Sequence, residues 1–288
     1  MLVLGAAGML GHKVCQVAGD AFEVFGTFRG RVPQVRGVYD RTKPILDIDV
    51  MRDDALERAI AVARPDVVVN AVGMVKQLDL ANDPIASIQL NALLPHVLAR
   101  LGDDRGFKLI HMSTDCVFSG QKGAYTEADT TDPVDFYGRT KLLGEPNGPG
   151  VLTMRTSIIG RELQTRHGLV EWFLSQRGRA INGWARAIYT GFTTEALARI
   201  IVDLLRSDNL LRGVWHVSSA AVSKYELLQM LNVAFGTRTE IRRDDSVVCD
   251  RSLESGRFWN ETGLQRPHWD EMISSLAKDP TPYRPSSG

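Results

Sequence analysis

The chain has 288 residues, of which 44% are hydrophobic and 24% charged, a composition typical of a globular protein with a sizeable core. Its 34 basic residues balance 34 acidic ones, so charge gives no indication of a nucleic-acid or membrane-surface partner. The cysteines are scattered and the histidines lack ligand spacing, so we expect neither a disulfide framework nor a metal. We find no leader-like start and no apolar run of ~20 residues, and therefore expect a cytoplasmic protein without a membrane segment.

Short apolar runs alternate with helical patterns through the first 155 residues. Strands are predicted at residues 2–4, 22–28, 45–48, 66–72, 107–113 and 151–157, and helices at 9–19, 54–63, 86–101 and 134–145. After an irregular stretch the pattern resumes with a helix at 194–205, a strand at 213–219 and a helix at 223–235. Such alternation is typical of an α/β protein whose parallel sheet is covered by helices on both faces.

A glycine-rich loop lies between the first strand and the first helix. The stretch GAAGMLG has the spacing GxxGxxG, which allows a tight turn and lets a pyrophosphate approach the main chain at a helix N-terminus. An ordinary strand–helix turn would look similar, but the position favours a dinucleotide. We expect the cofactor to contact Gly5, Gly8, Met9, Leu10 and Gly11.

The end of the second strand indicates which dinucleotide binds. The sequence there is GTFRGR, so Thr27 and Arg29 stand where NAD-binding sites usually carry an acidic residue. Arg29 is suited to a ribose 2′-phosphate, although a surface arginine is most often only solvated. NADP(H) is therefore favoured over NAD(H). Further along, Asp47 and Ile48 are expected to border the adenine.

A tyrosine and a lysine lie four residues apart in FYGRTK. On a helix, Tyr137 and Lys141 share one face, and we expect Asp132 to cap that helix. The ammonium should lower the pKa of the phenol from about 10, which would make it a useful proton donor. YxxxK is common by chance, but STDCVF ends a strand nearby. There Thr114 could bind a substrate carbonyl and Asp115 a sugar hydroxyl, or both could simply be polar loop residues.

The ordered motifs GAAGMLG, VVVNAVG, LNALLPHVLA, STDCVFSGQKGAYTEADTTDP, YGRTKLLGE and MRTSIIG resemble the extended short-chain dehydrogenase/reductases. The chain is most similar to the dTDP-4-dehydrorhamnose reductase family. The resemblance implies NADPH-dependent reduction of the 4-keto group of a nucleotide-activated 6-deoxysugar, in the biosynthesis of deoxysugar or polysaccharide precursors. The implied partner is a nucleotide sugar, and a homodimer is possible.

The implied fold is a Rossmann-type doubly wound parallel sheet with a smaller, discontinuous α/β substrate domain. We expect the NADP-binding domain to span residues 1–155, with residues 187–217 returning to it. The substrate domain would occupy mainly residues 156–288, through segments 156–186 and 218–288. The end of the chain after Lys278 is expected to be poorly ordered. His12 is expected on a helix surface, and His111 and His216 in the core.

The resemblance also implies roles for individual residues. Tyr137 would donate the proton, Lys141 would hold the nicotinamide ribose and lower the tyrosine pKa, and Thr114 would orient the carbonyl. Asn91 matches a helix asparagine of the family, and Arg155 begins a segment near the nicotinamide, unless it only forms a buried salt bridge. The residues that end the fourth strand would line the cofactor: Asn70, Ala71 and Val72.

Several positions depart from the family pattern on the substrate side. Cys116 replaces a tyrosine, RTSIIG lacks a tryptophan, and MVKQLDLA places Lys76 and Gln77 near the sugar. The glycine-flanked stretch NGWARAIYTG, read as a loop, brings Trp184 and Arg186 to the ligand, although packing and solvation are their ordinary roles. These changes are expected to affect which sugar binds, and not the reduction chemistry itself.

Two alternatives remain open from the sequence. One is a nucleotide-sugar epimerase or dehydratase that holds NAD tightly. The other is a non-catalytic NADP-binding regulatory subunit, like those of methionine adenosyltransferase. The sequence leaves open the nucleotide base, the sugar, the stereochemistry at C4 and the oligomeric state.

Overall fold

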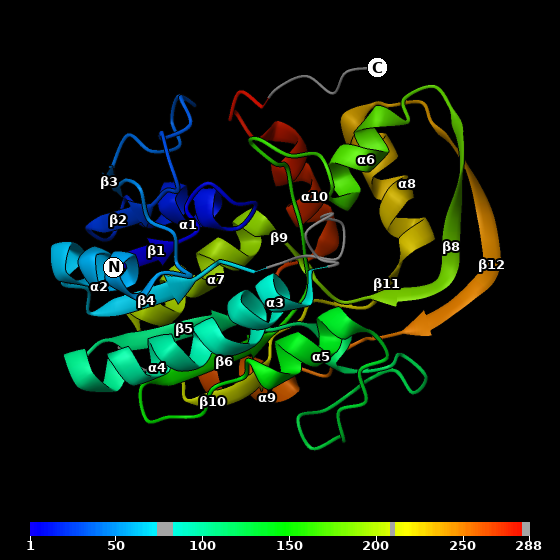
Figure 1. Cartoon of the computed structure of the whole chain (residues 1–288). Coiled ribbons are helices and arrows are strands. Elements are labelled where there is room, and N and C mark those ends of the chain that lie inside the picture. Colours follow the sequence, from blue (N-terminus) through cyan, green and yellow to red (C-terminus); the bar gives the residue numbers. More distant parts are fainter. Residues whose placement is uncertain (74–82, 208–210, 284–288) are drawn as a thin grey trace.

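The computed structural model describes residues 1–73, 83–207 and 211–283. Its centre is a seven-stranded sheet in the order β10-β6-β5-β4-β1-β2-β3, with every neighbouring pair parallel (Figure 1). The strands are β1 (Leu2–Leu4), β2 (Val24–Thr27), β3 (Thr42–Ile45), β4 (Val67–Asn70), β5 (Lys108–Met112), β6 (Val151–Arg155) and β10 (Gly213–His216). The strand order reverses between β1 and β4, the place where doubly wound sheets bind their ligands.

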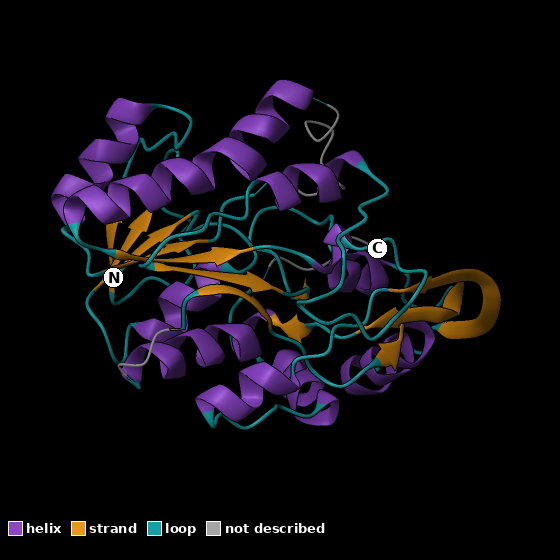
Figure 2. Cartoon of the chain, turned by 90° about the horizontal axis from the view of Figure 1, so that it is seen from below, coloured by secondary structure: helices purple, strands orange, loops and turns teal. Residues whose placement is uncertain are grey.

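Helices cover both faces of this sheet, as Figure 2 shows. One face packs against α1 (Gly11–Ala18) and α7 (Thr194–Arg206), and the other against α2 (Asp53–Ala63) and α4 (Leu94–Arg105). All three residues of β1 are buried, because a strand covered on both sides has no face left for water. The predicted doubly wound α/β fold is confirmed. No helix within the described ranges is both long and apolar enough to cross a bilayer.

A second, smaller sheet lies beside the first and extends as a long curved ribbon (Figure 1). It joins β11 (Val222–Ser223), β8 (Ala180–Tyr189) and β12 (Glu240–Asp250), and α8 (Lys224–Phe235) packs against β8. The predicted loop at NGWARAIYTG is therefore wrong, since Trp184 and Arg186 lie in β8. The two-domain division stays a prediction, and β8 spans its proposed boundary between residues 186 and 187.

The remaining elements are short. They are α3 (Pro84–Ser87), the π-helix η2 (Ile88–Leu93), the 3-10 helix η3 (Asp115–Val117), α5 (Phe136–Leu143), β7 (Ile158–Ile159), α6 (Leu169–Ser175), β9 (Phe192–Thr193), α9 (Gly256–Thr262) and α10 (Trp269–Lys278). The helix predicted at residues 86–101 runs through α3, η2 and α4 with a π-helical turn in its middle.

Three further predictions are wrong. The strand expected at residues 45–48 ends at Ile45, because Asp47 has a φ of 57°, which a β-strand cannot accommodate. His12 is not on the surface but fully buried. Residues 279–283, expected to be part of a poorly ordered end, pack against α1 through Lys13. His111 and His216 are buried in the core, as predicted.

Candidate active site

The glycine loop makes a tight turn between β1 and α1. Gly5 has a φ of +75°, a conformation that side chains disfavour. A Cβ atom at Gly11 would lie 2.1 Å from the Gly5 carbonyl oxygen, so helix and loop could not approach so closely with any other residue. The Gly5 N–H donates to the Thr27 hydroxyl at 3.2 Å, and the Tyr39 hydroxyl donates to the Ala6 carbonyl at 2.9 Å. Sequence reasoning missed Tyr39, which supports the glycine loop through this hydrogen bond.

The start of α1 is suited to a diphosphate. Within the described part of the chain, the backbone N–H groups of Met9 and Leu10 have no hydrogen-bond acceptor. No side chain caps the helix and no acidic residue lies in its first turn. Free N–H groups and the positive end of the helix dipole attract an anion, so these residues fit a dinucleotide.

Strand β2 ends at the buried Thr27, and Phe28 and Arg29 follow it where an NAD-binding site would usually carry an acidic residue. Arg29 is exposed and makes no hydrogen bond or ion pair with the described residues, which leaves its guanidinium free for a phosphate. Nearby, the Ile48 N–H donates to the Phe28 carbonyl at 3.0 Å. Ile48 itself is buried, and Asp47 is exposed beside it.

Helix α5 is held against the turn that carries Thr114. Its cap is Asp135, whose carboxylate accepts from the Gly138 N–H at 2.7 Å. The prediction that Asp132 caps this helix is wrong, because that carboxylate instead accepts from the Ser119 N–H at 2.8 Å. A Cβ atom at Gly138 would lie only 2.2 Å from the Cys116 carbonyl oxygen. The missing side chain lets the helix reach the 114–116 turn.

This close packing brings Tyr137 to Thr114. The pKa of Tyr137 is raised, mainly by burial and then by the nearby Cys116, while a hydrogen bond with Thr114 acts in the opposite direction. The predicted lowering of this pKa is therefore wrong for the structure as it stands. Burial removes the phenolate from water, and the Lys141 ammonium is engaged elsewhere.

Lys141 lies one turn along the same helix and is almost fully buried. Its ammonium donates to the Met112 carbonyl at 2.6 Å and lies 3.5 Å from His111 Nε2. Burial lowers the pKa of Lys141 to about 8, although Glu145 opposes the shift. On the far side of the imidazole, His111 Nδ1 lies 3.2 Å from the Asn70 amide. The end of β4 and helix α5 are thus linked through one buried histidine.

Two buried polar contacts hold the elements around Tyr137 and Lys141 in place. Asn91 lies in η2 and donates to the Thr140 hydroxyl at 3.3 Å, so it joins the π-helical turn to α5. Arg155 forms a buried ion pair with Glu145, with contacts of 2.8 and 2.7 Å, which is the alternative left open from the sequence. Glu145 also accepts from Ser113 at 2.6 Å. Sequence reasoning missed Glu145, although it closes the YGRTKLLGE motif.

The residues beyond Thr114 lie on the predicted substrate side of the site, where the sequence departs from the family pattern. Asp115 is buried, and burial raises its pKa despite the opposing charge of Arg251. One Arg251 nitrogen donates to Cys116 Sγ at 3.6 Å, a contact that sequence reasoning missed because the residues are far apart in the chain. Trp184 is 41% exposed, with the Lys224 ammonium 5.3 Å from its ring centre.

The remaining predicted residues belong to both the substrate side and the cofactor side of the site. Arg186 lies two residues beyond Trp184 in β8, on the same face of the strand. Ala71 and Val72 follow β4, and the Val72 N–H donates to the Asn70 side chain at 3.1 Å. Lys76 and Gln77 lie outside the described residues.

Comparison with known proteins fits this geometry. The family model of the RmlD substrate binding domain matches residues 1–247. A dTDP-4-dehydrorhamnose reductase from Burkholderia thailandensis is 31% identical over 78% of this chain and 74% of its own. Subunit beta of methionine adenosyltransferase 2 from Danio rerio is 26% identical over 82% of this chain and 73% of its own.

Solved structures agree with this assignment. The crystal structure of a hypothetical dTDP-4-dehydrorhamnose reductase from Sulfolobus tokodaii superposes with a TM-score of 0.78 and 26% identity. The superposition covers 93% of this chain and 97% of that one. The chain is a member of the RmlD substrate binding domain family, within the extended short-chain dehydrogenase/reductases.

Proposed function

We propose that the protein is an NADPH-dependent reductase of the 4-keto group of a nucleotide-activated 6-deoxysugar, acting in deoxysugar biosynthesis. The observation that carries the proposal is that Thr114, Tyr137 and Lys141 lie at the carboxyl end of β5, on the edge of the parallel sheet where the glycine loop follows β1. The name of the Burkholderia thailandensis relative supports the same activity.

Tyr137 is the group proposed to supply the proton that a reductase needs. NADPH, when bound, supplies a hydride to the keto carbon. The chain must then supply a proton to the oxygen, and the Tyr137 phenol is protonated at neutral pH and hydrogen-bonded to Thr114. Thr114, which hydrogen-bonds the phenol, is placed to orient the same carbonyl oxygen. Lys141 lies one helical turn further along α5, and stabilising the phenolate left behind would require its ammonium to leave the Met112 carbonyl.

The cofactor is NADP(H) rather than NAD(H), because Arg29 rather than a carboxylate follows β2. Replacing Arg29 with Ala removes a charge-assisted contact, so the Kd for NADPH should rise by about ten- to a hundredfold while that for NADH stays unchanged. Arg105→Ala, at the far end of α4, is the matched control. Equal Kd values for NADPH in all three proteins would contradict the proposed role of Arg29.

The substrate is tested with a panel of dTDP- and UDP-linked 4-keto-6-deoxyhexoses. We expect NADPH oxidation with at least one member, and NMR of the product to show a new hydroxyl at C4. Purified protein that carries tightly bound NAD and interconverts sugars without net NADPH loss would instead indicate an epimerase or dehydratase.

A second candidate rests on the likeness to subunit beta of methionine adenosyltransferase 2. In that case the chain would bind NADP(H) but leave every keto-sugar unchanged, and it would co-purify with a larger enzyme. The hydrogen bond between Tyr137 and Thr114, with Lys141 one turn along α5, favours catalysis, because a binding role needs no proton donor.

A further inference from the structure

The end of the chain lies against the helix that follows the glycine loop. Residues 279–283, here called the strap, follow α10 and contact side chains of α1. Asp279 forms an ion pair with Lys13, and both side chains are only 3% exposed. Lys13 also donates to the Thr281 hydroxyl at 3.3 Å. The strap is therefore held by buried polar contacts.

A set of close polar contacts joins the strap to the loop. His12 Nδ1 donates to the Gly8 carbonyl at 2.9 Å, and its Nε2 lies 3.0 Å from the Tyr283 hydroxyl. The Tyr283 hydroxyl in turn lies 2.9 Å from an Asp279 carboxylate oxygen. His12 is fully buried, so it has no water to replace these partners. The Gly8 carbonyl, which also accepts from the His12 backbone N–H at 3.1 Å, is thus linked through the His12 side chain to Tyr283, 271 residues beyond His12.

The strap also touches the segment on the other side of the loop. The Arg161 guanidinium lies 4.7 Å from the centre of the Tyr283 ring, and it pairs with the buried Glu171. In the same segment, a Cβ atom at Gly168 would lie 3.6 Å from Met9 Sδ. Tyr283 is consequently placed between the first turn of α1 and the 161–168 segment that borders Met9.

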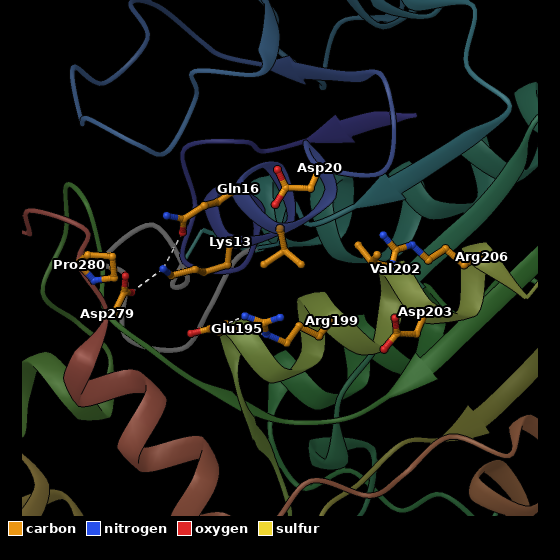
Figure 3. A pocket seen from close by; sticks show the side chains of 11 residues that line it. Lys13, Gln16, Asp20, Glu195, Arg199, Val202, Asp203, Arg206, Asp279 and Pro280 are labelled. Atoms are coloured by element: carbon orange, nitrogen blue, oxygen red, sulfur yellow. Dashed lines mark hydrogen bonds and ion pairs between the residues drawn. The ribbon is translucent and has the colours of Figure 1, made fainter.

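The surroundings of the ion pair are polar. Figure 3 shows Lys13 and Gln16 of α1 directed toward Asp279, with Glu195 and Arg199 of α7 across the space between the helices. These residues line a cavity of about 380 Å³, which Asp279 and Pro280 close at one end. Packing of apolar side chains therefore does little to fix the strap here, and the specific pairs set its position.

We propose that the strap is a positioning element for the dinucleotide. By holding His12 and Lys13, it fixes the first turn of α1, including the Gly8 carbonyl and the free N–H groups of Met9 and Leu10. Removing a strap contact should therefore weaken cofactor binding more than it slows turnover. This inference rests on one part of the proposed function, namely that the dinucleotide binds at the glycine loop.

The test is Tyr283→Phe, which removes the hydroxyl and keeps the ring beside Arg161. The Kd for NADPH should rise by about three- to tenfold, the loss expected for one or two hydrogen bonds, while kcat at saturating NADPH stays within twofold. Tyr225→Phe is the matched control, because that hydroxyl contacts only Gln229 on the exposed side of α8 among the described residues. Thr281→Val serves as a second strap variant should Tyr283→Phe fold poorly.

NADPH binding should in turn stabilise the position of the strap, since the linkage between two sites is reciprocal. NADPH should slow tryptic cleavage of the wild-type protein after the exposed Lys278, just before the strap, and should slow it less in Tyr283→Phe. Unchanged Kd values in both strap variants, or cleavage indifferent to NADPH, would overturn the inference. A wild-type protein that binds neither NADPH nor NADH would instead count against the proposed function.

Discussion

Gly138 lies at the closest contact between the proposed proton donor and the turn that orients the substrate. Replacing it with Ala adds one methyl group 2.2 Å from the Cys116 carbonyl oxygen and 3.0 Å from Pro133 Cβ. Real Cβ atoms essentially never approach within 3.0 Å, and the first obstacle is backbone rather than a flexible side chain. Helix α5 must therefore move away by about 1 Å, and Tyr137 moves with it.

A displacement of about 1 Å in a catalytic group lowers turnover by about a hundredfold. We expect kcat for NADPH oxidation with a reducible 4-keto-sugar to fall by that factor in Gly138→Ala. The Kd for NADPH should change by less than about threefold, because the glycine loop is untouched. The strain should also lower the free energy of unfolding by about 1–3 kcal/mol, measurable by urea titration.

The matched control is Gly256→Ala at the start of α9, where an added Cβ meets nothing within 4 Å. Its turnover and stability should stay near wild type. A Gly138→Ala protein with a wild-type kcat would refute the reasoning, because the position of α5 would then not matter for proton transfer.

The other predictions concern buried charge. Glu145→Ala leaves the buried Arg155 without its ion-pair partner and should lower the free energy of unfolding by about 3–5 kcal/mol. Glu195→Ala breaks an exposed ion pair on α7 and should lower it by less than about 1 kcal/mol. Comparable losses for the two variants in urea titrations would contradict this prediction. Lys141 has a folded-state pKa of about 8, below its ordinary 10.5, so the unfolded chain binds more protons between these pH values. From pH 8 to pH 10 the free energy of unfolding of the wild type should therefore rise by about 2 kcal/mol relative to that of Lys141→Met. Parallel profiles of unfolding free energy against pH for the two proteins would exclude a buried ammonium at Lys141.

The sequence predicted the framework of the site well. Strands that are mostly apolar and helices of regular period identify a doubly wound sheet, because burial on both faces favours apolar side chains. The spacing of Tyr137 and Lys141 is a local property of a helix, and the glycine pattern is a local property of a turn. These features depend on neighbours in the chain, and the structure places them as expected.

Features that depend on distant parts of the chain could not be predicted. His12 follows a loop and was expected in water, but Tyr283 and the fold around it bury the imidazole. The raised pKa of Tyr137 follows mainly from burial and then from Cys116, and the Lys141 ammonium turns to the Met112 carbonyl; none of this is visible in YxxxK. The contact of Arg251 with Cys116 likewise joins segments 135 residues apart.

The boundaries of two elements were also misjudged, each for a local reason. Asp132 precedes a proline and looked like a helix cap, yet Asp135 has the cap geometry and bonds the Gly138 N–H. The stretch around Trp184 contains glycine and arginine and was read as a loop, but pairing with β12 extends it into a ten-residue strand.

The central claim is that Tyr137 gives the proton that accompanies hydride transfer. Its most direct test is the single-turnover rate of NADPH oxidation by Tyr137→Phe, mixed with saturating 4-keto-sugar and followed by absorbance. The account predicts a rate lower by about 10²–10⁴-fold with the Kd for NADPH unchanged. A Tyr137→Phe protein that oxidises NADPH at the wild-type rate would contradict it.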